Sequence, residues 1–106
     1  MALTREFKDT IVARVRRDPR FREALFTEAM NAYLDGDTKT GKAMLRDLVN
    51  ATIGFEELAH VLKKPSKSLH RMLAPHGNPN TEHFFGIVSA LQKKAGVKLR
   101  VKAKAV

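Results

Sequence analysis

The sequence predicts an all-α domain of five to six helices that contains a helix-turn-helix and ends in one short β-strand. Apolar residues recur at helical spacing through most of the chain. Two short apolar-patterned segments between Gly54 and Leu73 are separated by a turn that contains proline, which indicates two helices set at an angle. Near the C-terminus, apolar and basic residues alternate, which is typical of a strand.

Length and composition limit the kinds of protein that this chain can be. A chain of 106 residues with 43% hydrophobic content predicts one domain with one core. Within it we expect an N-terminal helical extension (1–36), a core that contains the helix-turn-helix (37–95) and a C-terminal strand with a basic tail (96–106). Because there is no Cys, no apolar run near 18 residues and no apolar signal region after Met1, we expect a soluble cytoplasmic protein.

Two helices are expected in the N-terminal extension. Thr4 is placed to cap a first helix that ends near Arg17, and Asp18 with Pro19 starts a second that ends near Asp35. The apolar stripe of the first helix consists of Phe7, Ile11 and Val15. The broad apolar face of the second favours a core or a dimer interface over a ligand site, and it consists of Phe21, Leu25, Phe26, Ala29, Met30, Ala32, Tyr33 and Leu34.

A third helix follows the turn at Gly36. Glycine suits a left-handed C-cap and Asp37 suits the next N-cap, which together predict a helix that ends near Ala51. Gly41 inside this helix costs about 1 kcal/mol relative to Ala. The residues expected to face inward are Ala43, Met44, Leu45 and Leu48.

The helix-turn-helix is predicted over Phe55 to Leu73. Pro65 disfavours helical geometry at the residue before it, so the first helix ends by Lys63 and the proline lies in the first turn of the second. The small side chain of Ala59 lets the two helices cross closely. The apolar faces that share one core are Leu58, Val61 and Leu62 on the first helix and Leu69, Met72 and Leu73 on the second.

The C-terminal part should contain a loop, one more helix and the strand. Turn residues from Ala74 to Asn80 forbid a helix, Thr81 caps the last helix, and Gly96 follows its end near Lys94. The inward residues of this helix are Phe84, Ile87, Val88 and Leu91. The strand that follows has an apolar face of Val97, Leu99 and Val101 and a basic face of Lys98, Arg100 and Lys102.

The predicted strand has no second strand in the chain with which it can pair. Its backbone groups would pair most simply with the same strand of a second copy across a two-fold axis. We therefore expect a homodimer whose interface includes Val97, Leu99 and Val101, while a frayed basic tail remains the alternative.

The formal net charge of +9 is unevenly distributed. Residues 1–57 contain ten Lys or Arg and ten Asp or Glu, whereas residues 58–106 contain ten basic residues and only Glu82 as an acid. A one-sided positive field attracts polyanions, and nucleic acid is the leading candidate. Membrane lipid is the competing polyanion, but the basic residues are not joined to a helix with a bulky apolar outward face.

The outward face of the second helix of the pair is the candidate DNA-binding surface. Its side chains donate hydrogen bonds, none is acidic, and such a face suits phosphates and base edges. A helical hairpin with a solvated charged face is the alternative. The candidate DNA-binding residues are Ser66, Lys67, Ser68, His70 and Arg71, with Lys64 in the turn before them.

No catalytic or metal-binding pattern is present in the sequence. The four histidines His60, His70, His76 and His83 are not spaced like zinc ligands, and there is no Cys to join them. No nucleophile elbow or phosphate-binding loop surrounds the Ser, Asp and His residues. We therefore expect no enzyme, no metal and no cofactor.

The segment from Phe55 to Leu73 resembles the helix-turn-helix of lambda-repressor-like, Xre-type regulators, through LA at Leu58 and Ala59 and the later SLHRML. More narrowly, DGD, LRDLV, ELAHVL, SLHRML, GNPNTEHFFGIVSAL and VKLRV, in this order, resemble HigA-type addiction-module antidote proteins. The likeness covers about Arg20 to Val101. The family pattern commonly has Gly in the turn and Ser at the start of the recognition helix, where this chain has Lys63 and Pro65.

This resemblance implies an antitoxin that neutralises a RelE-like (HigB-like) ribonuclease toxin and represses its own operon. It places base contacts at Ser66, Lys67 and Arg71, with His70 beside them, and a phosphate contact at Ser68. Two hypotheses therefore stand. The chain is either a sequence-specific repressor of double-stranded DNA with a palindromic operator, or a protein-binding antidote or RNA-binding module whose basic surface reads no specific DNA.

Overall fold

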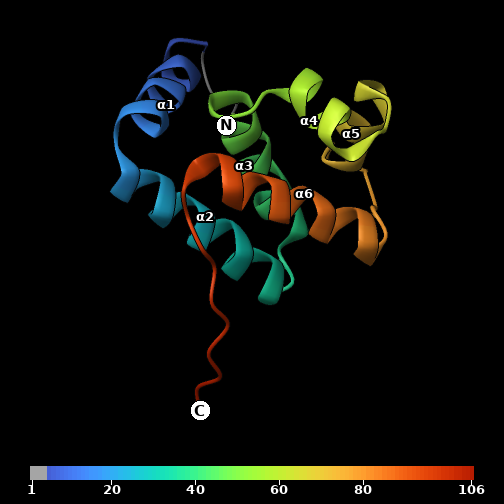
Figure 1. The fold of residues 1–106 in the computed structure, drawn as a ribbon. Helices are drawn as coiled ribbons and strands as arrows, with labels where there is room; N and C mark the ends of the chain where they lie inside the picture. Colours follow the sequence, from blue (N-terminus) through green and yellow to red (C-terminus); the bar gives the residue numbers. More distant parts are fainter. Residues whose placement is uncertain (1–4) are drawn as a thin grey trace.

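The computed structural model describes residues 5–106, and in this part of the chain it contains six helices and no strand (Figure 1). The predicted all-α class is confirmed, whereas the predicted cap at Thr4 lies outside the described residues. No helix among these residues is both long and apolar enough to cross a membrane. The helices are α1 (Arg5–Arg17), α2 (Pro19–Leu34), α3 (Thr38–Ala51), α4 (Phe55–Leu62), α5 (Ser66–Met72) and α6 (Thr81–Ala95).

Side-chain caps set the first residues of three helices. The carboxylate of Asp18 accepts hydrogen bonds from two backbone N–H groups at the start of α2, and Asp37 accepts one from Thr40 at the start of α3. At α6 the cap is Asn80, whose Oδ1 lies 2.7 Å from the His83 nitrogen. The prediction of Thr81 as that cap was wrong by one position.

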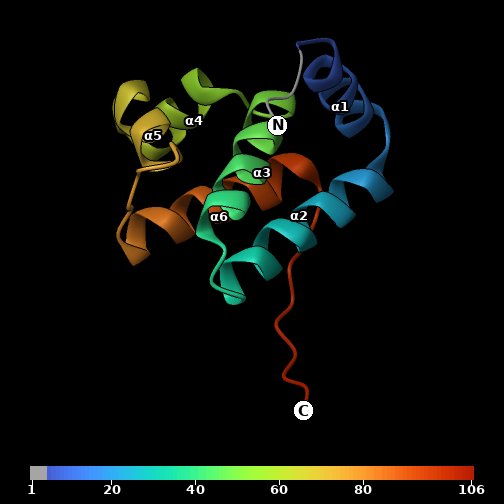
Figure 2. The same ribbon diagram turned by 180° about the vertical axis from the view of Figure 1, so that it is seen from behind.

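The helices α3 and α6 cross near the centre of both views, with α6 in front of α3 in Figure 1 and behind it in Figure 2. On one side α1 and α2 pack against α3, and on the other side α4 and α5 form the angled pair. The hydrophobic core contains buried side chains from all six helices. Its fully buried large side chains are Val15, Phe26, Leu45, Leu48, Val49, Leu58, Leu69, Leu73, Ile87 and Leu91.

Three apolar residues that were predicted to face inward are exposed to solvent. Phe7 is 50% exposed, Leu34 is 76% exposed and Val61 is 53% exposed. Phe7 lies in the first turn of α1 and Leu34 is the last residue of α2, whereas Val61 lies within α4. The apolar stripes of α1 and α2 are therefore not buried over the full length of these helices.

The C-terminal segment from Val97 is irregular, so the predicted β-strand is absent from the described chain. The nitrogen of Val97 donates to the carbonyl oxygen of Gln92 at 3.1 Å, and the nitrogen of Leu99 donates to its Oε1 at 2.8 Å. Val97 and Leu99 pack against the core, but Val101 is 95% exposed. The alternation of apolar and basic residues thus reflects packing of a coil along α6.

Candidate nucleic-acid interface

The turn between α4 and α5 depends on a left-handed residue, Lys63. Lys63 has a φ of 55° and a ψ of 47°. Xre-type regulators, which the sequence resembles here, commonly have glycine in this turn. This conformation lets the N–H groups of Lys63 and Lys64 donate to the last carbonyls of α4, at His60 and Ala59. Pro65 has an extended ψ of 137° and is the N-cap of α5, so it lies just before the helix and not in its first turn.

One face of α5 is fixed in the core. Leu69 and the C-cap residue Leu73 are fully buried, and α5 packs against α4, where Leu58 and Ala59 are also buried. Ala59, which was predicted to lie where the two helices cross, is buried at 8% exposure. Because the inner face is packed, the other side chains of α5 are held outward.

The structure brings all six predicted DNA-binding residues together on α5 and the turn before it. Lys67, His70 and Arg71 are exposed, while Lys64, Ser66 and Ser68 are partly buried. There is no acidic residue in α5. Among the described residues the side chains of Lys67 and Arg71 have no ion-pair or hydrogen-bond partner. This helix therefore presents two unpaired cations on a fixed scaffold.

The ring of His70 is stacked on the ring of Phe55, with centroids 3.8 Å apart and an interplanar angle of 21°. Phe55 is the first residue of α4, so this contact joins the start of one helix to the outer side of the other. Sequence reasoning did not identify this partner. The stack restrains the His70 side chain, so His70 links α4 and α5 and is less free to contact a base.

Two basic side chains of α3 bind the segment that follows α5, and sequence reasoning missed them. The Nζ atom of Lys42 lies 3.1 Å from the carbonyl oxygen of Pro75 and 2.6 Å from that of Gly77. The Nη1 atom of Arg46 donates to the carbonyl oxygen of Leu73. The only signal in the sequence was a pair of cations spaced i, i+4 on a helix with an apolar inner face.

The loop after α5 approaches the helix so closely that Gly77 has no room for a side chain. A Cβ atom there would overlap the backbone carbonyl oxygens of Arg71 and Met72. The nitrogen of Gly77 donates to the carbonyl oxygen of Ala74 at 2.8 Å, which closes the turn. The backbone of the exposed Arg71 is therefore in direct contact with the loop that Lys42 holds.

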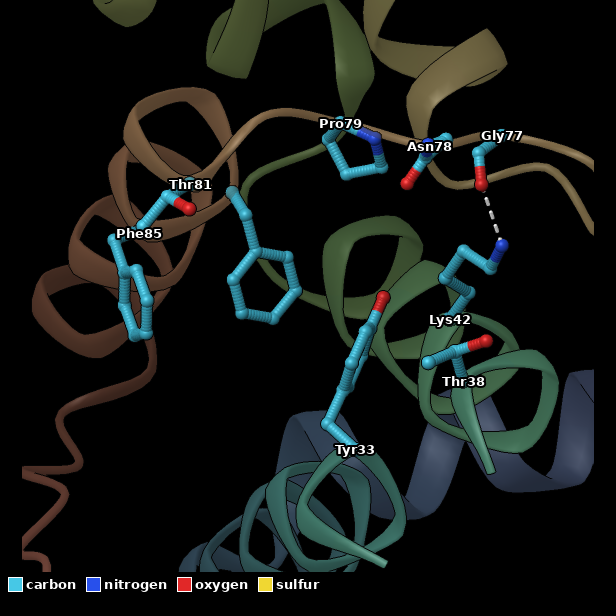
Figure 3. A pocket seen from close by; sticks show the side chains of 9 residues that line it. Tyr33, Thr38, Lys42, Gly77, Asn78, Pro79, Thr81 and Phe85 are labelled. Atoms are coloured by element: carbon cyan, nitrogen blue, oxygen red, sulfur yellow. Dashed lines mark hydrogen bonds between the residues drawn. The ribbon is translucent and has the colours of Figure 1, made fainter. Parts of the chain in front are cut away.

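A small cavity of about 210 Å³ lies beside this loop (Figure 3). Tyr33 of α2 and Lys42 of α3 line one side of it, and the loop residues Asn78 and Pro79 line the other. The hydroxyl of Tyr33 is buried and has no hydrogen-bond partner among the described residues. Burial raises the pKa of Tyr33 to about 12, and the nearby charge of Arg46 lowers it only partly.

The basic C-terminal segment does not join the surface of α5. After α6 the chain leaves the molecule on a different side from α4 and α5, as both views show (Figures 1 and 2). Lys98, Arg100, Lys102 and Lys104 are exposed there. Within one copy of the chain, the basic residues of the C-terminal segment and those of α5 thus lie on separate parts of the surface.

No protein-family model, curated protein or solved structure matches this chain. The resemblance to HigA-type antidote proteins therefore rests on the order of its sequence motifs.

Proposed function

We propose that the chain is a sequence-specific DNA-binding repressor whose helix α5 enters the major groove. The observation that supports this most strongly is the presence of two exposed, unpaired cations, Lys67 and Arg71, on a helix that has no acid and is anchored by its other face. A helix fits the major groove, where each base pair presents a distinct pattern of donors and acceptors. A rigid scaffold beneath the helix keeps these donors in register with that pattern.

The residues of this surface have different roles in the proposal. The guanidinium of Arg71 contacts a guanine edge through two hydrogen bonds, whereas the ammonium of Lys67 contacts a phosphate or a single base acceptor. Ser66, Ser68 and Lys64 lie at the start of the helix, where small donors and one cation suit phosphates. His70 supports the surface through its stack on Phe55.

We further propose, from the resemblance alone, that the domain is lambda-repressor-like and that the protein is a HigA-type antitoxin. In this reading it represses its own toxin-antitoxin operon and binds a RelE-like or HigB-like toxin. The basic segment after α6 extends away from α4 and α5 (Figures 1 and 2).

The repressor is proposed to act as a homodimer. Two recognition helices about 34 Å apart read two half-sites of a palindromic operator. Since Gln92 already engages the N–H groups of Val97 and Leu99, self-pairing would start at Arg100, and no described hydrogen bond occupies the backbone from there on. Sedimentation of the full chain and of a chain truncated after Gly96 tests this, and a monomer in both cases would contradict it.

Selection from a pool of randomised duplexes tests the DNA-binding proposal. We expect the selected sequences to converge on a palindrome bound at least about a thousandfold more tightly than random duplex. The affinity should fall steeply with salt, because phosphate contacts release counterions. Equal binding of all duplexes, together with co-purification of a ribonuclease-like partner or of RNA, would instead support the protein-binding or RNA-binding alternative.

A further inference from the structure

We propose that Lys42 and Arg46 are positioning residues that lock the C-terminal end of the recognition helix α5 onto α3. This inference rests on the proposed DNA-binding role of α5, although the lock itself can be measured without DNA. Neither residue is part of the outward face of α5. Both act through the backbone that follows it, at Leu73, Pro75 and Gly77.

The end of a short helix needs partners for its last carbonyl groups. The last four C=O groups of any α-helix lack partners within the helix, and α5 is only seven residues long. Cations near a helix C-terminus also interact favourably with the helix dipole. Arg46 supplies such a cation at Leu73, the C-cap residue of α5, and Lys42 supplies one to the loop directly after it.

Burial indicates that the contact of Lys42 is specific. The Lys42 residue is only 5% exposed, which is rare for a lysine, and a buried ammonium needs hydrogen-bond partners. Its partners are the carbonyl oxygens of Pro75 and Gly77, at 3.1 and 2.6 Å. Neither Lys42 nor Arg46 forms an ion pair with a carboxylate among the described residues. Their charge is directed at the loop.

The loop transmits this attachment to the base-reading part of α5. Gly77 packs directly against the backbone carbonyls of Arg71 and Met72, where even a methyl group would overlap. The loop also borders the cavity of about 210 Å³, whose opposite wall includes Tyr33 and Phe84 (Figure 3). The Lys42 hydrogen bonds hold this loop at Pro75 and Gly77, directly beside the last turn of α5.

Hydrogen exchange of the free protein tests the lock. In Lys42→Met we expect the amides of Leu69 to Ala74 to exchange about tenfold faster relative to those of α3, as a lost charged hydrogen bond would produce. Lys42→Arg should restore most of the protection, and Arg46→Met should act in the same direction as Lys42→Met. The matched control is Lys39→Met, an exposed lysine one turn earlier on α3. Equal acceleration in all helices, or no difference from the control, would overturn the proposal.

Salt dependence of binding to a selected duplex separates positioning from direct contact. Lys42→Met should weaken binding with an unchanged dependence of log affinity on log salt, because it removes no phosphate contact. Lys67→Met should reduce that slope by about 1 if it contacts a phosphate. A reduced slope in Lys42→Met would overturn the positioning role. If exchange shows the lock but the wild-type chain selects no duplex, the proposed function fails and the lock stands.

Discussion

The Nε atom of Arg22 lies 3.1 Å from the carbonyl oxygen of Ala95, so α2 is hydrogen-bonded to the last residue of α6. The Nη1 atom of the same side chain lies 2.8 Å from the carbonyl oxygen of Val15 and 3.1 Å from that of Arg16. One guanidinium thus binds the C-terminal ends of both α1 and α6. Like Lys42 and Arg46, Arg22 belongs to residues 1–57, where basic and acidic residues are equal in number. These three basic side chains bind backbone carbonyl groups and so stabilise the fold.

Replacing Arg22 should lower the free energy of unfolding. Arg22→Met keeps most of the apolar stem but leaves three carbonyl groups without this donor, which should cost about 2 kcal/mol. Urea denaturation followed by circular dichroism measures this, with Arg20→Met as an exposed control on the same helix. Similar losses in the two variants would show that the carbonyl contacts contribute little.

Glycine at position 63 should stabilise the protein. Lys63 has a left-handed conformation that costs a residue with a Cβ atom roughly 1 kcal/mol or more, whereas glycine adopts it freely. Because glycine also makes the unfolded chain more flexible, we expect a net gain of up to about 1 kcal/mol in Lys63→Gly. Lys64→Gly, one residue later with a negative φ, should gain nothing. Thermal unfolding of both variants decides the matter, and a gain restricted to position 64 would contradict the assigned turn.

Two glycine-to-alanine substitutions should have opposite effects. Gly77→Ala forces a methyl group into the carbonyls of Arg71 and Met72, so it should destabilise the protein by at least about 2 kcal/mol. Gly86→Ala lies within α6 and places its Cβ 3.7 Å from Leu62, an ordinary contact, so it should stabilise by about 0.5 to 1 kcal/mol. If Gly77→Ala melts at the wild-type temperature, the loop does not approach α5 as described.

Removing the hydroxyl of Tyr33 should change how stability depends on pH. Because burial raises the pKa of Tyr33 from 10.0 to about 12, folding favours the neutral phenol. The stability from this group is complete below pH 10 and is lost as pH rises from 10 to 12. Tyr33→Phe should therefore be at least as stable at pH 7, where the hydroxyl has no described partner, and should lose less stability than the wild type over that range. If the urea midpoints of the wild type and of Tyr33→Phe change by the same amount between pH 7, 10 and 12, the result would argue against a buried hydroxyl.

Arg71 should contribute most to the choice of DNA sequence. If its guanidinium reads a guanine, Arg71→Ala should cost about 1 to 3 kcal/mol of binding free energy and relax preference at one base position of each half-site. Lys39→Ala, an exposed cation on α3, is the control for general charge loss. Titrations of the selected duplex and of its single-base variants provide the measurement. Equal effects at both positions would mean that α5 is not the recognition helix.

Helix boundaries were predictable because the signals that set them are local. Pro19, Gly36, Asp37 and Gly96 act within a few residues of their own position, and α2, α3 and α6 end within a residue or two of where the sequence indicates. The outward face of α5 was also predictable, since its apolar spacing alone fixes which side is buried.

Contacts between distant segments were not predictable in this way. The hydrogen bonds of Lys42 to the loop and the stack of His70 on Phe55 depend on how helices pack, which no local pattern encodes. The strand prediction failed at short range, through a contact between residues seven apart. The side chain of Gln92, a neighbouring helical residue, takes the N–H of Leu99 that a partner strand would have bound.

The direction of the segment after α6 has a practical consequence for reporter fusions. This segment leaves the molecule away from α5 (Figure 1), so if α5 binds DNA as proposed, a fluorescent protein joined after Val106 would stand clear of the duplex. The same bulky label would lie beside the backbone from Arg100 to Val106 and would hinder any association through it. We therefore expect such a fusion to bind single half-sites normally while failing to hold two half-sites cooperatively.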